Sequence, residues 1–170
     1  ETGSSEQQEF VIDEFFALIR SLVSDPAQMG PMFVHNMRNA LLTLMSDPKH
    51  PGTVVDIIRL FTDDTYVRQW KQKITDPLVL SFWQREMART SNYHKSEMLG
   101  YLISKLGGLV ENERLRAVVG QAHSTVDMSS VLAESKILLV NLAQGQIGQP
   151  SANLLGKVIM TKLQLAARER

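Results

Sequence analysis

The feature that most constrains the fold is a change of pattern late in the chain. Up to Ala133 the apolar residues recur at helical spacing, whereas residues 137–142 form an almost continuous aliphatic run. Such a run is typical of a strand that is buried on both faces of a parallel sheet. A polar loop at 143–149 and a long helix from Pro150 to about Ala167 come after it, which is half of a crossover unit. Because one strand cannot pair with itself, we expect its sheet partners to lie outside this chain.

The rest of the 170-residue chain reads as a series of helices separated by proline, glycine and capping residues. Thr53 with Asp56 has the spacing of a capping box, and Asp76 before Pro77 has the pattern of an N-cap followed by proline at the first helical position. Gly107–Gly108 is expected to end one helix. We expect helices at about 6–24, 31–46, 54–61, 64–74, 77–89, 95–106 and 112–119, with a short turn at 129–133.

The sequence therefore predicts a mainly α fold with two parts. Residues 6–133 are expected to form an irregular all-α bundle, and residues 134–170 to contribute one buried-type strand and a long helix to an incomplete Rossmann-like sheet. Residues 1–5 are short, polar and unlike the rest of the chain, so we interpret them as an added remnant without a role in the fold.

Composition excludes several classes of protein. Eighteen basic and eighteen acidic residues give a formal net charge of zero, so charge alone does not indicate nucleic acid. The absence of cysteine excludes disulfides, thiolate zinc sites and cysteine nucleophiles, and it fits a cytoplasmic protein. No apolar run approaches the roughly 20 residues that span a bilayer.

Several stretches of the chain, taken in order, resemble conjugative DNA-transfer ATPases, the coupling-protein relatives of type IV secretion in the HerA/FtsK group of hexameric DNA motors. The resemblance covers about residues 10–170 and depends on the order of its pieces, since none is specific alone. The pieces are Met29–Phe33, His35, Arg38–Leu42, Pro51–Thr53, Ile58–Asp63, Asp76–Pro77, Ser81–Trp83, Val119–Gln121, Lys136–Gly145, Ile147–Gly148, Ser151–Gly156 and Thr161–Ala167. The chain departs from the family at Glu134–Ser135 and at Gln149–Pro150, which puts a role for the intervening loop in doubt.

The resemblance implies that the chain is the helical domain inserted into the ATPase sheet, plus the adjoining strand and helix. It implies an intact parent that forms a hexamer, binds ATP and magnesium, and moves DNA or a DNA–protein transfer substrate. That parent would act in the bacterial cytoplasm, at the inner face of the membrane. The chain itself is expected to recognise substrate and support the ring, without a cofactor and without catalysis.

Tests for ATPase motifs within the chain are negative. Gly156–Lys157 is the only Gly-Lys pair, but it is followed by Val158 and falls within an expected helix, so it does not fit a phosphate-binding loop. Phe10–Glu14 has the apolar-then-acidic look of a Walker B strand. Helical spacing continues straight through it, so a helix is favoured.

The histidines and methionines give only weak indications of a metal site or a binding groove. The histidines are scattered, at positions 35, 50, 94 and 123, and only His94 with Glu97 could share a metal from one helix face. A surface contact is the more ordinary interpretation of that pair. The methionines at 29, 32, 37 and 45 are expected to fill the core rather than to form an adaptable groove.

For DNA, a basic rim could form from Arg85, Arg89 and Lys95 near Trp83 and Tyr93. Lys71 and Lys73 would form a second cluster, and the plainer interpretation is helix solubility with Trp83 in the core. Two other classes remain open. One is a free-standing helical adaptor that binds proteins, and the other is an enzyme whose site is too dispersed to see in sequence.

Overall fold

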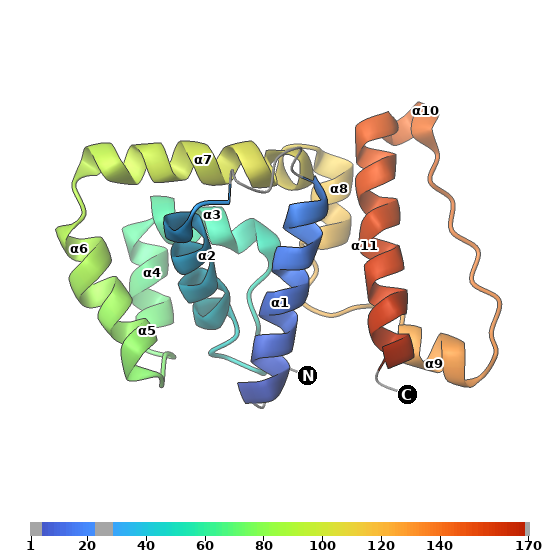
Figure 1. Ribbon diagram of the computed structural model, residues 1–170, viewed down its shortest axis with the longest axis horizontal. Coiled ribbons are helices and arrows are strands. Elements are labelled where there is room, and N and C mark those ends of the chain that lie inside the picture. Colours follow the sequence, from blue (N-terminus) through green and yellow to red (C-terminus); the bar gives the residue numbers. More distant parts are fainter. Residues whose placement is uncertain (1–4, 23–28, 169–170) are drawn as a thin grey trace.

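The computed structural model describes residues 5–22 and 29–168, and these residues form a mainly helical fold (Figure 1). No described helix is both long and apolar enough to cross a membrane. The elements in chain order are α1 (Ser5–Leu22), α2 (Pro31–Leu44), α3 (Val54–Thr62), α4 (Asp64–Lys71), α5 (Pro77–Ser81), the π-helical turn η2 (Phe82–Glu86), α6 (Met87–Arg89), α7 (Asn92–Val110), α8 (Glu113–Val119), α9 (Met128–Ala133), α10 (Gln144–Ile147) and α11 (Gln149–Arg168).

Most helix starts are fixed by the side chains that the sequence indicates. The Thr53 N–H and hydroxyl both donate to Asp56 Oδ2 at 2.8 Å, so the pair expected at the start of α3 forms through the Asp56 carboxylate. Asp63 accepts from the N–H groups of Thr65 and Tyr66 at the start of α4. Asp76 accepts from the Leu78 N–H at the start of α5. These caps satisfy amides that have no partner inside their own helix.

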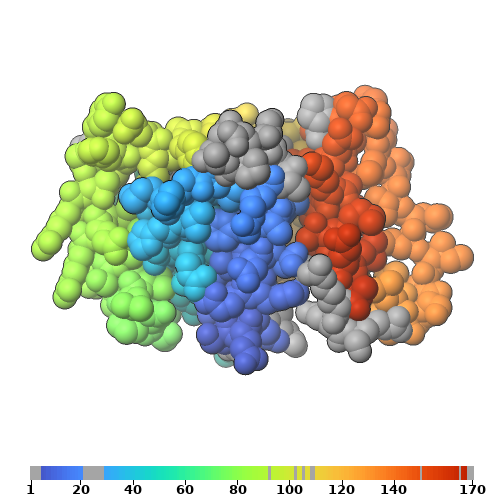
Figure 2. Space-filling model, in the orientation of Figure 1, coloured from blue at the N-terminus to red at the C-terminus, as the bar shows by residue number. Residues whose placement is uncertain are grey.

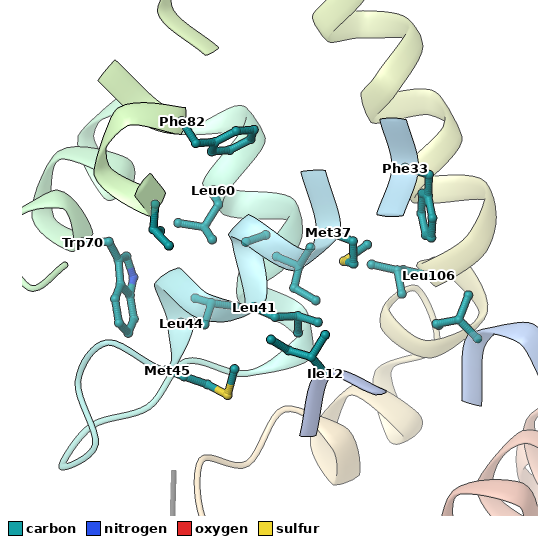
Figure 3. Packing of buried hydrophobic residues seen from close by; sticks show 14 of the residues in the cluster. Ile12, Phe33, Met37, Leu41, Leu44, Met45, Leu60, Trp70, Phe82 and Leu106 are labelled. Carbon is teal, nitrogen blue, oxygen red and sulfur yellow. The ribbon is translucent and has the colours of Figure 1, made fainter. Parts of the chain in front are cut away.

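The core is built around α2, which α1, α3, α4 and α5 contact. Met37 and Ala40 of α2 are fully buried, and Ile57 and Leu60 of α3 pack into the same cluster (Figure 3). Met37 and Met45 are buried and Met29 is partly buried against the core, as expected of filler, whereas Met32 is exposed. The α1 helix is tied to α2 by an ion pair between Glu9 and Arg38, and the hydrogen bond from Arg38 lowers the pKa of Glu9.

Three details of the helices differ from what the sequence predicts. The helix expected to end at Gly107–Gly108 continues to Val110. Leu106 and Val110 are both buried in the core cluster, so their packing outweighs the roughly 1 kcal/mol that each glycine costs in a helix interior. The loop expected at 143–149 contains α10, and the helix at 77–89 contains a π-helical turn at 82–86.

The expected strand at 137–142 has no partner among the described residues. This segment runs as an extended chain from α9 to α10, beside α11 and opposite to it in direction (Figure 1). The α11 helix itself packs against α1, α7 and α9, and Leu154 belongs to the main core. Residues 134–168 therefore attach to the helical bundle through α11, while the segment before α11 stays at the periphery.

Candidate functional site

The segment 137–142 is apolar but largely exposed, which is its most unusual property. Ile137 and Leu139 are each 89% exposed, whereas Leu138 and Leu142 are half-buried. Val140 is also exposed, at 44%, so the apolar side chains of this segment are open to solvent on more than one side. None of these residues makes a backbone hydrogen bond to another described residue. Exposed aliphatic side chains beside unpaired backbone groups make this segment an unusual part of the described surface.

A groove of about 680 Å³ lies next to this segment, between it and the bundle. Its volume lies within the range of about 300–1,000 Å³ that is common for ligand sites. Figure 2 shows the segment at the margin of the molecule beside α11. Most groove side chains are apolar, and none is acidic. The lining residues are Phe15, Leu18, Val54, Val118, Val119, Gln121, Ala122, His123, Ser124, Thr125, Val126, Met128, Leu138, Leu139, Val140, Asn141, Leu155, Val158, Ile159 and Lys162.

The polar side chains of the groove are few. Lys162 Nζ donates to Ser124 Oγ at 3.3 Å, and His123 is exposed on the same loop as Ser124. No carboxylate lines the groove, so its lining offers no general base of the Asp or Glu type. The mainly apolar lining is suited to binding apolar groups.

The first group of predicted DNA contacts lies on neighbouring elements at one end of the molecule. Arg85 of η2 and Arg89 of α6 are exposed, and Lys95 is half-buried in the first turn of α7. None of the three takes part in an ion pair with a described residue. Tyr93 is 70% exposed in the same turn of α7. These cations are therefore available to phosphate.

Trp83 does not belong to that surface. It is buried, and its indole N–H donates to Thr43 Oγ1 at 2.7 Å. The plainer interpretation, a tryptophan in the core, is confirmed.

The second group of predicted contacts is engaged within the fold. Lys73 forms an ion pair with Asp47 at 2.9 Å, and its ammonium lies 4.7 Å from the centre of the Trp70 ring. The hydrogen bond from Lys73 lowers the pKa of Asp47 to about 2. Lys71 is half-buried in the last turn of α4. Lys73 is thus a connection between α4 and the loop after α2, and it is a weaker candidate for phosphate than Arg85 or Arg89.

The histidines do not form a metal centre in the described part of the chain. No group of three or more His, Asp or Glu residues there is placed to hold an ion. His94 Nδ1 lies 2.8 Å from Ser91 Oγ, so its nearest polar partner is the capping serine of α7 rather than Glu97. His35 Nε2 lies 2.9 Å from Glu86 Oε2, a contact between α2 and η2 that no sequence pattern indicates because 51 positions separate the two residues.

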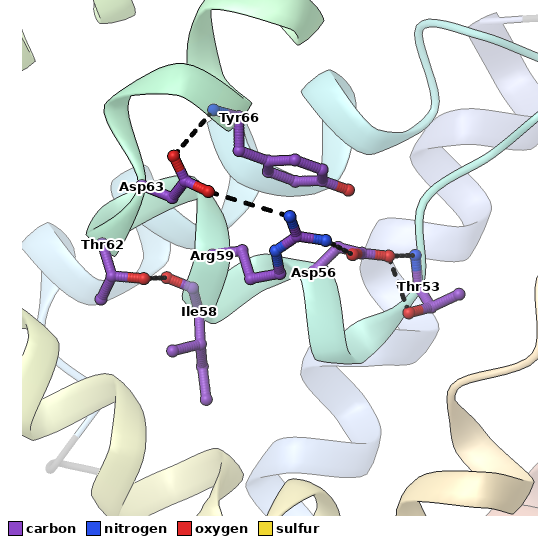
Figure 4. Close-up of polar contacts among 7 residues, drawn as sticks. All are labelled: Thr53, Asp56, Ile58, Arg59, Thr62, Asp63 and Tyr66. Atoms are coloured by element: carbon purple, nitrogen blue, oxygen red, sulfur yellow. Dashed lines mark hydrogen bonds and ion pairs between the residues drawn. The ribbon is translucent and has the colours of Figure 1, made fainter.

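A second polar cluster that sequence reasoning missed joins α3 to α4. The Arg59 guanidinium lies 3.9 Å from the centre of the Tyr66 ring, with Asp56 at 3.7 Å and Asp63 at 3.8 Å (Figure 4). Burial raises the pKa of the Tyr66 hydroxyl, and the neighbouring Asp56 adds to that rise. Both acids also cap helices, so the cluster orients α3 and α4 and has no side chain free for chemistry.

The two sequences tested for ATPase motifs both lie in helices. Gly156 and Lys157 fall inside α11, and residues 10–14 fall inside α1 with Ile12 buried in the core. A phosphate-binding loop needs backbone amides that are free to wrap the phosphates, and those of a helix interior are not. Neither stretch is therefore arranged to bind a nucleotide.

No protein-family model, curated protein or solved structure matches this chain. The support for a function is therefore the geometry of the chain itself.

Proposed function

We propose that this chain is the helical recognition and supporting domain of a hexameric DNA-translocating ATPase of the conjugative, type IV secretion coupling-protein class. The main support is the segment 137–142, which is apolar on both faces, has no backbone partner among the described residues, and runs opposite to α11. This is how a strand and helix of a Rossmann-like sheet are arranged when the neighbouring strands are absent. In the intact protein, those strands come from segments outside this chain.

This chain and the other segments of the parent protein would have different roles. The parent's other segments bind ATP and magnesium and form most of the ring, in the bacterial cytoplasm at the inner face of the membrane. This chain contacts the DNA or DNA–protein substrate and joins its helical bundle to the ATPase sheet through residues 134–170. It contributes no catalytic residue.

Substrate contact is assigned first to Arg85, Arg89 and Lys95. They are cationic, they have no ion-pair partner among the described residues, and they occupy adjoining elements. Lys71 and Lys73 are assigned a minor part, because Lys73 already interacts with Asp47. Cations that replace counterions on a phosphate backbone produce affinity that falls steeply with salt.

The most direct test is to read the parent gene on both sides of residues 6–170. A glycine-rich loop ending in Gly-Lys-Ser/Thr upstream, and an apolar strand ending in Asp-Glu downstream, are the expected result. A start codon directly before Glu6 and a stop codon directly after Arg170 would overturn the proposal.

DNA binding tests the assignment of the contact residues. The triple variant Arg85→Gln, Arg89→Gln, Lys95→Gln should bind a fluorescein-labelled oligonucleotide more weakly. Its plot of log affinity against log salt should be shallower by about 2 to 3, since each lost phosphate contact removes about 0.7–0.9. The matched control Lys71→Gln, Lys73→Gln should change that slope less. Equal slopes for the triple variant and the original chain would remove these residues from the interface.

Catalysis is tested by ATP hydrolysis. The purified chain should release no phosphate from ATP above the buffer rate, with magnesium present. Turnover that persists through repurification would contradict the division of labour and would favour the alternative of an enzyme with a dispersed site.

One observation favours a second candidate, a free-standing adaptor that binds other proteins. Such a protein would have to cover residues 137–142 with its own helices or with a partner. The described helices of this chain leave Ile137 and Leu139 exposed, so the adaptor would need a partner at this segment. The two candidates differ in whether the partner strand belongs to the same polypeptide.

A further inference from the structure

We infer that the groove beside α11 binds a free alkyl carboxylate, with its carboxylate group at Lys162 and its alkyl chain along α11. The inference goes beyond the proposed function and does not depend on it. It rests on the side chains that line the groove and on the charge of Lys162.

One wall of the groove is a face of α11 that is apolar along most of its length and ends in a cation. Leu155, Val158, Ile159 and Lys162 all line the groove. The last three follow Leu155 by three, four and seven positions, so all four lie on one face of the helix. From Leu155 to Lys162 this face is about 10 Å long, because each helical residue adds about 1.5 Å. An apolar strip with a positive charge at one end matches an alkyl chain that carries one negative group.

The other walls of the groove are mainly apolar as well. Phe15 and Leu18 of α1 and Val119 of α8 line it, and all three are half-buried. Half-buried apolar side chains around a hollow still contact water, and they lose that contact when an alkyl chain enters. The apolar walls therefore favour a hydrocarbon chain over a polar ligand.

The charge of Lys162 is not neutralised by the described part of the chain. Its ammonium donates to Ser124 Oγ at 3.3 Å, and it forms no ion pair with a described residue. The Ser124 hydroxyl donates its own proton to the Val126 carbonyl at 2.9 Å, which leaves its oxygen to accept from Lys162. An ammonium has three donors, so a carboxylate can bind Lys162 while the bond to Ser124 persists.

The same charge argues against other occupants of the groove. No acidic residue lines it, and residues 137–142 contain none, so a second copy that inserted this segment would cover Lys162 without supplying a counter-charge. An uncharged lipid would do the same. Covering an ammonium that has no partner of opposite charge is unfavourable. An alkyl carboxylate fills the apolar walls and also neutralises Lys162.

The binding test titrates the whole chain with octanoate, decanoate and dodecanoate, each below the concentration at which it forms micelles. Calorimetry should show one saturable site. The dissociation constant should fall about tenfold for each added pair of methylene groups, because each buried methylene contributes a factor of about four. Absence of saturable binding, or affinity that does not depend on chain length, would overturn the inference.

The variant Lys162→Gln tests the contact with the carboxylate. It should weaken decanoate binding about fivefold or more, and it should leave the binding of decanol, which has no charge, nearly unchanged. Lys157→Gln is the matched control, since Lys157 is exposed on the same helix and does not line the groove. Equal losses of decanoate and decanol binding in Lys162→Gln would overturn the assignment of Lys162.

A cationic amphiphile tests the sign of the charge without any substitution. Decyltrimethylammonium has an alkyl chain of the same length as decanol, but Lys162 should repel it. It should therefore bind the original chain at least about tenfold more weakly than decanoate. Equal affinities would mean that the groove selects only for apolar chains, which would contradict the role of Lys162.

Two further measurements separate other occupants. A dimer that forms without ligand and prevents decanoate from binding would assign the groove to a second copy. Cosedimentation with phosphatidylglycerol vesicles, without saturable binding of free decanoate, would assign it to a membrane surface. Either result would overturn the inference and leave the salt-dependent DNA binding of the proposed function untouched. Conversely, a parent gene without the ATPase motifs would overturn the proposed function and leave decanoate binding unchanged.

Discussion

At the residue scale, the few polar side chains buried in the described core include Thr43, which hydrogen-bonds both to a side chain and to the backbone. Thr43 is fully buried, accepts the indole N–H of Trp83, and donates its own hydroxyl to the Asn39 carbonyl at 2.7 Å. The network therefore connects successive turns of α2 to η2 through two hydrogen bonds. Such a network favours one packing arrangement because every alternative leaves a buried donor without an acceptor.

The variant Thr43→Val should lower the free energy of unfolding by about 1–3 kcal/mol, because it leaves the buried indole N–H of Trp83 without an acceptor. The loss is measured by urea denaturation. Thr62→Val is the matched control, since the Thr62 hydroxyl is exposed and donates only to its own helix. A Thr43→Val variant as stable as that control would show that the Trp83 hydrogen bond contributes nothing.

The ion pair of Asp47 with Lys73 predicts that the free energy of unfolding depends on pH under acidic conditions. The hydrogen bond from Lys73, with smaller contributions from the N–H groups of His50 and Lys49, lowers the pKa of Asp47 from 3.8 to about 2. A carboxyl whose pKa is lower in the folded state stabilises that state above its unfolded pKa. The contribution is lost as pH falls from about 4 to about 2.

Lys73→Met should therefore raise the pKa of Asp47 toward 3.8 and flatten the fall in stability across that interval. The pKa is measured from the carboxyl carbon shift in NMR titration, and stability from urea midpoints at each pH. Lys71→Met is the control that should move neither. An Asp47 pKa that stays near 2 in Lys73→Met would mean that the N–H groups of Lys49 and His50 are the main cause.

At the element scale, the glycines show how local preference and packing compete. In α7 the helix passes through Gly107 because Leu106 and Val110 on either side are buried. The loop before α3 shows the reverse, since a Cβ on Gly52 would lie 2.3 Å from Leu44 Cδ2 and 2.9 Å from its Cβ. One glycine is tolerated in its helix, and the other is required by close approach of the backbone to α2.

A pair of alanine substitutions tests this contrast. Gly100→Ala, in α7 where the new Cβ would meet no atom within 4 Å beyond the adjoining residues and helix backbone, should raise the free energy of unfolding by about 0.5–1 kcal/mol. Gly52→Ala should lower it, because Leu44 is buried and cannot move away freely. Thermal or urea unfolding gives both values. Changes of the same sign would contradict the packing described around Leu44.

At the scale of the whole molecule, substitutions in the exposed segment 137–142 should alter self-association of the protein while leaving its free energy of unfolding nearly unchanged. Replacing Ile137 and Leu139 by lysine should change the free energy of unfolding by less than about 0.5 kcal/mol, because both side chains are 89% exposed. The same double variant should associate less at high concentration, since charged residues protect strand edges. Urea denaturation and light scattering give the two quantities.

Leu154→Lys is the matched control for that pair. Leu154 is buried in the main core, so the variant should lose at least about 2 kcal/mol of stability. If the Ile137, Leu139 double variant were destabilised to the same degree, the segment would have to be packed in solution rather than free to accept a strand.

The sequence by itself determined the mainly helical fold and the starts of α3, α4 and α5. A helix bonds within itself, and its caps lie only a few residues away, so Thr53, Asp63 and Asp76 identify those starts from spacing alone. The prediction that residues 10–14 are helical has the same basis.

Only the tertiary structure decided the contacts between distant residues. Packing of Leu106 and Val110 carried α7 through two glycines, and the pairs His35–Glu86 and Asp47–Lys73 join positions that no local pattern relates. The groove next to residues 137–142 likewise depends on where α1, α8 and α11 lie. For that segment, the sequence predicted a strand buried on both faces, whereas the structure leaves Ile137 and Leu139 exposed and without a backbone partner among the described residues. The hydrogen bonds of a strand come from another chain segment, whereas those of a helix come from its own.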